Sequence, residues 1–349
     1  MNILASPIAV KSNPYIESFY SALKNANRVI KIYPFRLKYF FKSIDACHFH
    51  WPESFLNASS AYLRIKGFLS LCIKIKLLKI LKVKIVWTVH NFRPHEKYGD
   101  TILEALFYKF WLKNVDALIF LSRASQKIFF INYSTKIESV VIPHGHYRDI
   151  FKAIVPSSYL KNLFGIEEND FVFGHYGLIR RYKNIPKLIK EFKKLSGDNY
   201  KLIVAGSVHK ADKNLKKEII FEAKGDDRVK LHLQFIKNEE MKELYTFTNM
   251  IILPFKDIVN SGSALLSLSM NCPIVVPDNE YMQELQSCVD KKNLYLFPGE
   301  FSFMDEGLEN FVFRNKIYGY NNDKTIDLEH FDWANIGKMT ANYFHNIVH

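Results

Sequence analysis

Short apolar runs alternate with helix-like segments along nearly the whole chain, and this alternation restricts the fold more than any other feature of the sequence. Strands separated by helices pair in parallel, because each crossover helix returns the chain to the same edge of the sheet. In the first half the predicted strands are residues 2–4, 29–32, 46–50, 84–90, 117–121 and 139–142. Helical spacing lies between them, at residues 14–25, 61–81, 101–114 and 123–132.

The second half repeats the alternation. Its predicted strands are residues 171–176, 201–205, 229–233, 250–253, 274–276 and 293–297, and its predicted helices are 185–195, 214–223, 238–246 and 262–270. A glycine- and proline-containing stretch at 144–158 is expected to join two domains, residues 1–150 and 151–330. A last helix at 331–347 is expected to belong with the first domain. Ligands of such doubly wound sheets bind at the carboxyl ends of the strands.

The composition excludes several classes of protein. The four cysteines have no metal-type spacing and no pattern of a disulfide framework, which fits a reducing cytosol. The N-terminus lacks the regions of a signal peptide, and no stretch reaches the roughly 18 uninterrupted apolar residues of a membrane span. We therefore expect a cytoplasmic protein without a transmembrane helix.

The formal net charge of +13 suits a polyanionic partner. Between Glu53 and Glu96 there is no acidic residue, and the basic region 61–84 mixes lysines and arginines with large aliphatic residues at near-helical spacing. Such a surface suits the anionic inner face of the plasma membrane. The alternative is a helix that covers its own domain and leaves a solvated lysine face. Nucleic acid is not expected as a partner, since no nucleic-acid-binding signature is present.

The stretch 250–278, MIILPFKDIVNSGSALLSLSMNCPIVVPD, predicts a strand, a polar loop, a short helix and a second strand. The helix begins at small residues of N-cap character, Asn260, Ser261, Gly262 and Ser263. Unpaired N–H groups and the positive end of a helix dipole beside a strand end are typical of a phosphate site. Taken alone, the stretch is also consistent with an ordinary turn that has a good N-cap.

A second cluster, GLIRRYKN at 177–184, follows one predicted strand and precedes a helix. Gly177 permits close backbone approach, and Arg180 and Lys183 lie just past the strand end, where a diphosphate would lie. The alternative is a solvated basic turn. Together with the helix start at Ser261, the cluster favours a diphosphate site in the second domain.

The order of these segments resembles that of GT-B glycosyltransferases, close to family 4 and to bacterial exopolysaccharide and capsule sugar transferases. GLIRRYKN is followed by KLIVAGSV, LHLQFIKNEEMKELY and the 250–278 stretch, and ACHFHWPE, VWTVHNFRPHE, ALIFLS and VVIPHGHY agree in the first half. The resemblance covers roughly residues 1–345. It implies an α/β protein of the GT-B fold, with two Rossmann-like doubly wound domains facing across a cleft. The first domain would take the acceptor, and the second would bind the nucleotide-sugar.

The resemblance also implies roles for residues of the second domain. Arg180 and Lys183 match the basic pair that holds the donor diphosphate, and residues 261–263 match the loop whose N–H groups bind it. Three consecutive residues match the segment that frames the nucleobase: Gln234, Phe235 and Ile236. Leu266 departs from the family, because a glutamate that binds the donor ribose usually stands there. Retaining or inverting stereochemistry therefore does not carry over.

In the first domain, two histidines end predicted strands. His90 matches a family histidine near the donor sugar. His50 is assigned to the acceptor side together with Asn13, although a structural role is the alternative for His50.

An inverting transfer needs a general base for the acceptor hydroxyl. Glu53, Glu96 and Asp100 follow strand ends, and their alternative roles are helix caps or solvated loops. We take His90, Glu96 and Glu53 as the catalytic candidates.

No metal or other cofactor is expected. His144 and His146 are two residues apart, but no carboxylate or thiol cluster accompanies them, and GT-B enzymes generally work without a metal. The expected function is transfer of a sugar, as a hexosyltransferase, from a nucleotide-sugar to a polyprenyl-diphosphate-linked saccharide in bacterial surface polysaccharide biosynthesis, on the inner face of the plasma membrane. The alternative is a non-catalytic nucleotide- or saccharide-binding subunit that supports a partner transferase.

Overall fold

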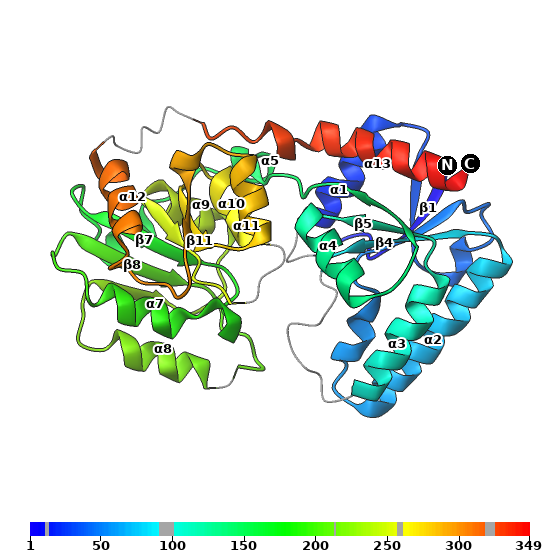
Figure 1. Cartoon of the computed structure of the whole chain (residues 1–349), viewed down its shortest axis with the longest axis horizontal. Helices are drawn as coiled ribbons and strands as arrows, with labels where there is room; N and C mark the ends of the chain where they lie inside the picture. The colour runs from blue at the N-terminus through cyan, green and yellow to red at the C-terminus, as the bar shows by residue number, and fades with distance from the viewer. Residues whose placement is uncertain (11–13, 91–100, 213, 257–260, 318–324) are drawn as a thin grey trace. The chain divides into compact units, whose positions relative to one another are not determined.

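The computed structural model describes residues 1–10, 14–90, 101–212, 214–256, 261–317 and 325–349. The chain divides into two compact units (Figure 1). Unit 1 comprises Met1–Gly145 together with His330–His349, and unit 2 comprises His146–Glu329. The chain thus leaves unit 1 once, and its last segment returns there.

Unit 1 is built on a sheet of six parallel strands in the order β2-β1-β3-β4-β5-β6. The strands are β1 (Asn2–Ser6), β2 (Lys31–Pro34), β3 (Ala46–Phe49), β4 (Lys84–Val89), β5 (Ala117–Phe120) and β6 (Glu138–Val141). Every residue of β3 and β5 is buried, as expected for central parallel strands whose two faces are both covered. The six strands predicted for the first half are confirmed, with ends that differ by at most two residues.

The helices of unit 1 are α1 (Tyr15–Ala26), α2 (Ala61–Ile80), α3 (Thr101–Asn114), α4 (Arg123–Asn132) and α13 (Trp333–Val348). Three short 3-10 helices lie at Leu37–Tyr39, Pro52–Asn57 and Glu329–Phe331. Figure 1 shows α13 lying along α1. A Cβ at Gly337 would lie 2.4 Å from the carbonyl oxygen of Ala22, so only glycine lets the two helices approach so closely. The last helix of the chain therefore completes the first unit.

Unit 2 has a second sheet of six parallel strands in the order β12-β11-β10-β7-β8-β9. The strands are β7 (Phe171–Tyr176), β8 (Tyr200–Ala205), β9 (Val229–His232), β10 (Met250–Ile252), β11 (Ile274–Pro277) and β12 (Leu294–Phe297). All six predicted strands of the second half are confirmed, with ends that differ by at most one residue.

The helices of unit 2 are α5 (Arg148–Lys152), α6 (Tyr159–Phe164), α7 (Ile185–Phe192), α8 (Leu215–Ala223), α9 (Asn238–Thr246), α10 (Gly262–Ser269), α11 (Glu280–Ser287) and α12 (Glu306–Ile317), with 3-10 turns at Arg181–Lys183 and Lys291–Asn293. The predictions of α7, α8, α9 and α10 are confirmed, whereas α5, α6, α11 and α12 were not predicted. One core cluster packs side chains of α7, α8 and α12 against β7, β8 and β10. Figure 1 shows α7 and α8 side by side along the sheet.

In each sheet the strand order reverses at one point. The reversal lies between β1 and β3 in unit 1 and between β7 and β10 in unit 2. Open parallel sheets bind ligands at the carboxyl ends of the strands beside such a reversal. Each unit therefore has one edge at which a ligand site is expected. Within the described ranges, no helix combines the length and apolar character needed to cross a membrane.

Candidate functional site

The loop that follows β7 lies against the loop that follows β8. A Cβ at Gly206, whose φ is +144°, would lie 1.8 Å from the carbonyl oxygen of Gly177, whose own φ is +102°. Beyond this contact the backbone N–H of Ile179 donates to Ser207 at 2.9 Å, and that of His209 donates to Ile179 at 2.9 Å. Two glycines thus let the two loops continue the parallel pairing past the ends of their strands, which fixes the start of the 177–184 loop.

Lys183 is the electrostatically unusual residue of this loop. Only 5% of it is exposed, and its Nζ lies 5.4 Å from the centre of the Phe255 ring and 3.9 Å from the Cβ position of Gly177. Burial first, and then the charge of Arg180, lower the pKa of Lys183 to about 8. Among the described residues, no carboxylate forms an ion pair with it. A buried ammonium without a counter-charge is costly, so the arrangement indicates a site for an anion.

Arg180 is oriented by a residue that the sequence analysis missed. Its Nη2 lies 3.1 Å from each ring nitrogen of His209. The backbone N–H of Ala211 donates to Nδ1 of the same ring at 3.3 Å. His209 comes from the loop after β8, so a long-range backbone pairing, Ile179 with Val208, brings it to Arg180. His209 directly follows the motif KLIVAGSV, but nothing in the local spacing points to the arginine.

The start of α10 lies on the same edge of the sheet. Oγ of Ser261 accepts the backbone N–H of Ala264 at 3.1 Å, which is the predicted N-cap. The hydroxyl of Tyr147 lies 3.2 Å from the Cβ position of Gly262, so this turn has a second hydroxyl beside it. Leu266 lies one turn further along α10 and is partly exposed, rather than part of the core. The predicted residue Asn260 lies outside the described residues.

The structure brings the two predicted clusters to neighbouring strands. β10, which leads to α10, pairs directly with β7, which leads to Gly177. The backbone N–H of Lys256 also donates to the carbonyl of Tyr182 at 2.8 Å, which ties the two loops together. Gly177, Arg180, Lys183 and the start of α10 therefore lie at the strand reversal of unit 2, while their role in binding a diphosphate stays a prediction.

The predicted nucleobase segment follows β9, two strands from β7. Ile236 is buried at 8% exposure, whereas Phe235 is 68% exposed. Nε2 of Gln234 lies 2.9 Å from Nε2 of His232. Phe235 is thus the member of the segment that is free to contact a planar base, and Ile236 holds the loop to the core.

In unit 1, histidines gather at the carboxyl ends of β3 and β4. Nδ1 of His50 lies 3.0 Å from Nε2 of His90, and the Trp51 ring stacks on His90 at 4.5 Å and 23°. Tyr15, at the start of α1, meets His90 edge-on at 5.1 Å. Burial lowers the pKa of both His50 and His90, and their neighbouring histidines lower it further. The pair is therefore neutral, suited to hydrogen bonding rather than to carrying a positive charge.

Two residues before His50, His48 links α1 to the sheet through side-chain hydrogen bonds. Its Nδ1 lies 3.0 Å from the Tyr20 hydroxyl, and its Nε2 lies 2.8 Å from Oγ1 of Thr88. It is fully buried, and burial lowers its pKa to about 3. His48 thus anchors α1 to β3 and β4 beneath the His50–His90 pair.

Glu53 lies in the 3-10 helix after β3. Burial raises the pKa of its carboxyl to about 7, and burial first, then the charge of this carboxyl, raise the pKa of Tyr108 on α3. One carboxyl oxygen, Oε2, is buried without a hydrogen-bond partner among the described residues. A carboxyl with a pKa near neutrality has the property that a general base requires. The other predicted residues of this unit, Asn13 and Glu96, lie outside the described residues.

Within the part of the chain that the structure describes, no three or more His, Cys, Asp or Glu side chains form a group able to hold a metal ion. The His144 side chain contacts two neighbours. Its Nδ1 lies 2.7 Å from the Gly145 carbonyl oxygen, and the centre of its ring lies 4.3 Å from that of Tyr15. His144 therefore packs within unit 1.

Two doubly wound parallel sheets and the matches to known proteins together support a GT-B glycosyltransferase. Residues 160–298 match the family model of Glycosyl transferases group 1. Two sequence relatives are each a GDP-mannose:glycolipid 4-beta-D-mannosyltransferase of Xanthomonas campestris pv. campestris. Both are 24% identical to this chain, one over 331 residues and one over 334, which are 94% of this chain and 86% of the relative.

Solved structures of low sequence identity share the fold. Sucrose-phosphate synthase from Thermosynechococcus elongatus aligns with a TM-score of 0.67 and 13% identity, covering 99% of this chain and 98% of that one. HepE from Anabaena, solved with UDP and glucose, aligns with a TM-score of 0.63 and 16% identity, covering 100% and 97%.

The first prediction concerns Lys183. In Lys183→Met, affinity for a nucleoside diphosphate should fall by about 1–3 kcal/mol, because a charged hydrogen bond is lost. The folded-state pKa of about 8 lies below the ordinary 10.5, so the unfolded chain holds more protons between these values. The free energy of unfolding of the unliganded wild type should therefore rise with pH across this window. The Met variant should lack that rise, as measured by urea unfolding at each pH.

Lys217→Met, an exposed lysine on α8, is the matched control and should keep both nucleotide affinity and the pH-dependent rise. Unchanged nucleotide affinity in Lys183→Met would sink the diphosphate assignment.

Proposed function

We propose that this glycosyltransferase moves a sugar from a nucleoside-diphosphate-sugar to a lipid-linked saccharide. The proposed lipid is a polyprenyl diphosphate, and the proposed pathway is bacterial surface polysaccharide biosynthesis. The observation that carries the donor half is the buried Lys183, which lacks a carboxylate partner among the described residues at the strand reversal of unit 2. The acceptor half is supported by the two Xanthomonas relatives, whose name includes a glycolipid. GDP-mannose, which the same name includes, is the first candidate donor.

In this proposal the donor diphosphate lies between the 177–184 loop and the start of α10. Arg180 offers its guanidinium fork and Lys183 a point charge, while the first N–H groups of α10 point at the same anion. These groups stabilise the negative charge that develops on the leaving nucleoside diphosphate. The proposed reaction therefore uses no metal.

The proposed acceptor side is the carboxyl edge of β3 and β4. The neutral His50–His90 pair supplies hydrogen bonds without a charge. Glu53, which follows the same strand, is the proposed general base, since its orphaned oxygen and a pKa of about 7 suit it to accept a proton from an acceptor hydroxyl. This role applies to an inverting transfer.

The proposed membrane contact is the outer side of α2. Leu71, Ile75 and Leu78 bury a narrow stripe against unit 1. A second apolar stripe lies on the outward side of the helix. It consists of Tyr62, Ile65, Leu69, Ile73 and Ile80. Together with Leu63, these side chains are 46–76% exposed. Two of the lysines on this helix are held by the protein, because Lys79 pairs with Asp116 at 2.6 Å and Lys76 with Asn114 at 3.2 Å.

Figure 1 shows α3 side by side with α2, and α3 adds two more exposed apolar side chains, Ile102 and Leu106. The alternative was a helix whose outer side carries solvated lysines alone. The outward side of α2 instead carries a stripe of apolar side chains. An apolar ridge flanked by Lys66 and Lys82 suits the interface of an anionic bilayer. This ridge supports the proposed position of the enzyme at the inner face of the plasma membrane.

Donor binding is tested with GDP, UDP, dTDP and CMP in a thermal-shift screen, and transfer with GDP-mannose labelled in the sugar and a lipid-linked saccharide fraction. We expect GDP to raise the melting temperature most, because GDP-mannose is the first candidate donor. A ligand at 100 times its Kd adds about 2.7 kcal/mol to the free energy of unfolding. Arg180→Ala should weaken binding by about 1–3 kcal/mol. Its neighbour Arg181, which pairs with Glu218 at 2.9 Å on the surface, provides the control Arg181→Ala. A screen in which no nucleoside diphosphate stabilises the protein would exclude the proposal.

The base is tested by the pH profile of transfer. Because the pKa of Glu53 is raised to about 7, the carboxylate form and the rate should increase as pH rises through 7 and then level off. Glu53→Gln should lower kcat by about 10²–10⁴-fold and remove this increase. Glu17→Gln, an exposed glutamate on α1, should behave as the wild type. A Glu53→Gln enzyme that keeps the wild-type profile would overturn the assignment.

Membrane contact is tested by sedimentation with vesicles that contain phosphatidylglycerol. The double variant Leu69→Asp, Ile73→Asp should lose vesicle binding by about 1.5 kcal/mol or more per side chain, because each apolar group no longer leaves water. Ile131→Asp, at a residue that is 73% exposed on α4, is the matched control. Equal partitioning of the double variant and the wild type would show that α2 does not contact the membrane.

A further inference from the structure

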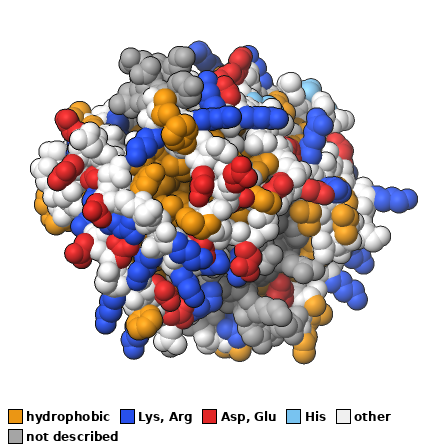
Figure 2. Space-filling model, turned by 60° about the vertical axis from the view of Figure 1, so that its left-hand side comes forward, with side chains coloured by type: hydrophobic (Ala, Val, Ile, Leu, Met, Phe, Trp, Pro, Cys, Tyr) orange, Lys and Arg blue, Asp and Glu red, His pale blue; other side chains and the backbone are white. Residues whose placement is uncertain are grey.

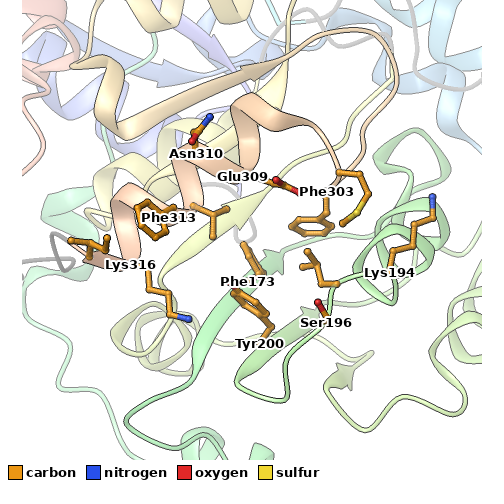
Figure 3. A pocket seen from close by; sticks show the side chains of 13 residues that line it. Phe173, Lys194, Ser196, Tyr200, Phe303, Glu309, Asn310, Phe313 and Lys316 are labelled. Atoms are coloured by element: carbon orange, nitrogen blue, oxygen red, sulfur yellow. The ribbon is translucent and has the colours of Figure 1, made fainter.

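Unit 2 contains a pocket of about 770 Å³ at the edge of its sheet opposite the strand reversal loops (Figure 3). Its walls come from β7, from the start of β8, from Leu195 and Ser196 after α7, and from α12. Gly177 follows the carboxyl end of β7, whereas Tyr200, which lines the pocket, is the first residue of β8. Because β7 and β8 are parallel, these positions lie at opposite ends of the strands. The pocket therefore belongs to neither the donor site nor the acceptor side, and its volume lies within the range of small-molecule sites.

The inner wall of the pocket is aromatic and rigid. Phe173 and Tyr200 stack with ring centres 5.8 Å apart at 30°, and Phe303 meets Phe173 at 5.0 Å and 62°. Phe173 and Phe303 are at most 2% exposed, so they are fixed by the core around them. Phe173, Phe303, Leu195 and Val312 offer no hydrogen-bonding atom, whereas Ser196, Tyr200 and Asn310 carry polar groups. The wall is therefore mostly apolar, with polar groups at a few positions.

The mouth of the pocket is also apolar. Met304, Phe313 and Ile317 line it and are 49%, 61% and 58% exposed. Figure 2 shows hydrophobic side chains gathered around a hollow on this side of the molecule, with Lys, Arg, Asp and Glu side chains bordering it. Single exposed apolar residues are ordinary, but a cluster around a cavity is typical of a site that takes an apolar ligand.

Charge at the rim is positive. The Nζ of Lys316 lies 5.0 Å from the centre of the Tyr200 ring, and no carboxylate pairs with it among the described residues. Lys194 pairs with Glu191 at 2.8 Å, but that carboxylate is shared with Lys187 at 3.1 Å. Glu309 is the acidic residue among those that line the pocket. Lys316, which no described carboxylate pairs with, therefore favours an anionic group at the rim.

We infer that this pocket binds a single-chain amphiphile with an anionic head group, its hydrocarbon chain against Met304, Phe313 and Ile317 and its head beside Lys316. A flexible chain fits a mostly apolar wall, and Lys316 supplies the charge complement of the head. A folded protein partner does not enter a pocket of this size, whereas a chain-like ligand does. The site lies in unit 2, apart from the α2 surface in unit 1, and it does not rest on the proposed transfer reaction.

The test is calorimetric titration of the full chain, below the critical micelle concentration, with dodecanoate, dodecyl phosphate, dodecanol and inorganic phosphate. We expect one site per chain for both anionic amphiphiles. Dodecanol should bind about tenfold more weakly, the order of one charge-assisted hydrogen bond, and inorganic phosphate should give no saturable heat. Lys316→Met should weaken the two anions about tenfold and leave dodecanol unchanged.

Variants locate the site. Phe313→Asp and Met304→Asp, both at exposed positions that tolerate substitution, should each lose tenfold or more in affinity, since a charge then faces the hydrocarbon chain. Phe221→Asp, at a residue that is 70% exposed on α8 of the same unit, is the matched control and should bind as the wild type. Absence of saturable binding, wild-type affinity in Phe313→Asp and Met304→Asp, or a loss that instead follows Ile73→Asp on α2 would each overturn the inference.

Discussion

The parallel pairing of β7 with β10 determines where the chemistry of unit 2 can take place. These strands are neighbours in space but are separated in the chain by β8 and β9, so the strand order reverses between them. The loops that follow them cannot cross over the same edge and instead diverge to opposite sides, which leaves room for a ligand. The contact between Tyr182 and Lys256 then holds the two loops at a fixed separation. Every residue of the proposed donor site depends on this arrangement.

Electrostatics divides the two units into different tasks. Unit 2 keeps a cation, Lys183, in a place where water does not screen it, so any interaction with an anion there is strong. Unit 1 instead keeps its strand-end histidines neutral by burying them together. The negatively charged leaving group is stabilised by a cation, which the environment in unit 2 supplies. The hydroxyl nucleophile needs uncharged hydrogen-bonding partners, which the environment in unit 1 supplies.

β3, β5 and β7 were predictable because they are buried on both faces and therefore read as continuous apolar runs. α12 was not, since Leu308, Phe311 and Val312 face the core while Phe313 and Ile317 face outward, which removes the single apolar stripe that marks a helix. In the site, the small and basic residues were visible in the sequence. The burial of Lys183 was not, because Arg181 two positions earlier has similar chemistry and lies on the surface. The His209 contact was missed because it depends on a long-range backbone pairing.

The return of α13 to unit 1 has a consequence for how the chain folds during synthesis. Residues 146–329 are contiguous and contain the whole of unit 2, whereas α1 of unit 1 lacks one of its packing partners until α13 has been made. The close contact of Gly337 with Ala22 joins positions separated by nearly the full length of the chain. The second unit is therefore made before α13, and the part of α1 that α13 covers stays open until α13 has been made. The order of folding is thus the reverse of the order in which the two units begin.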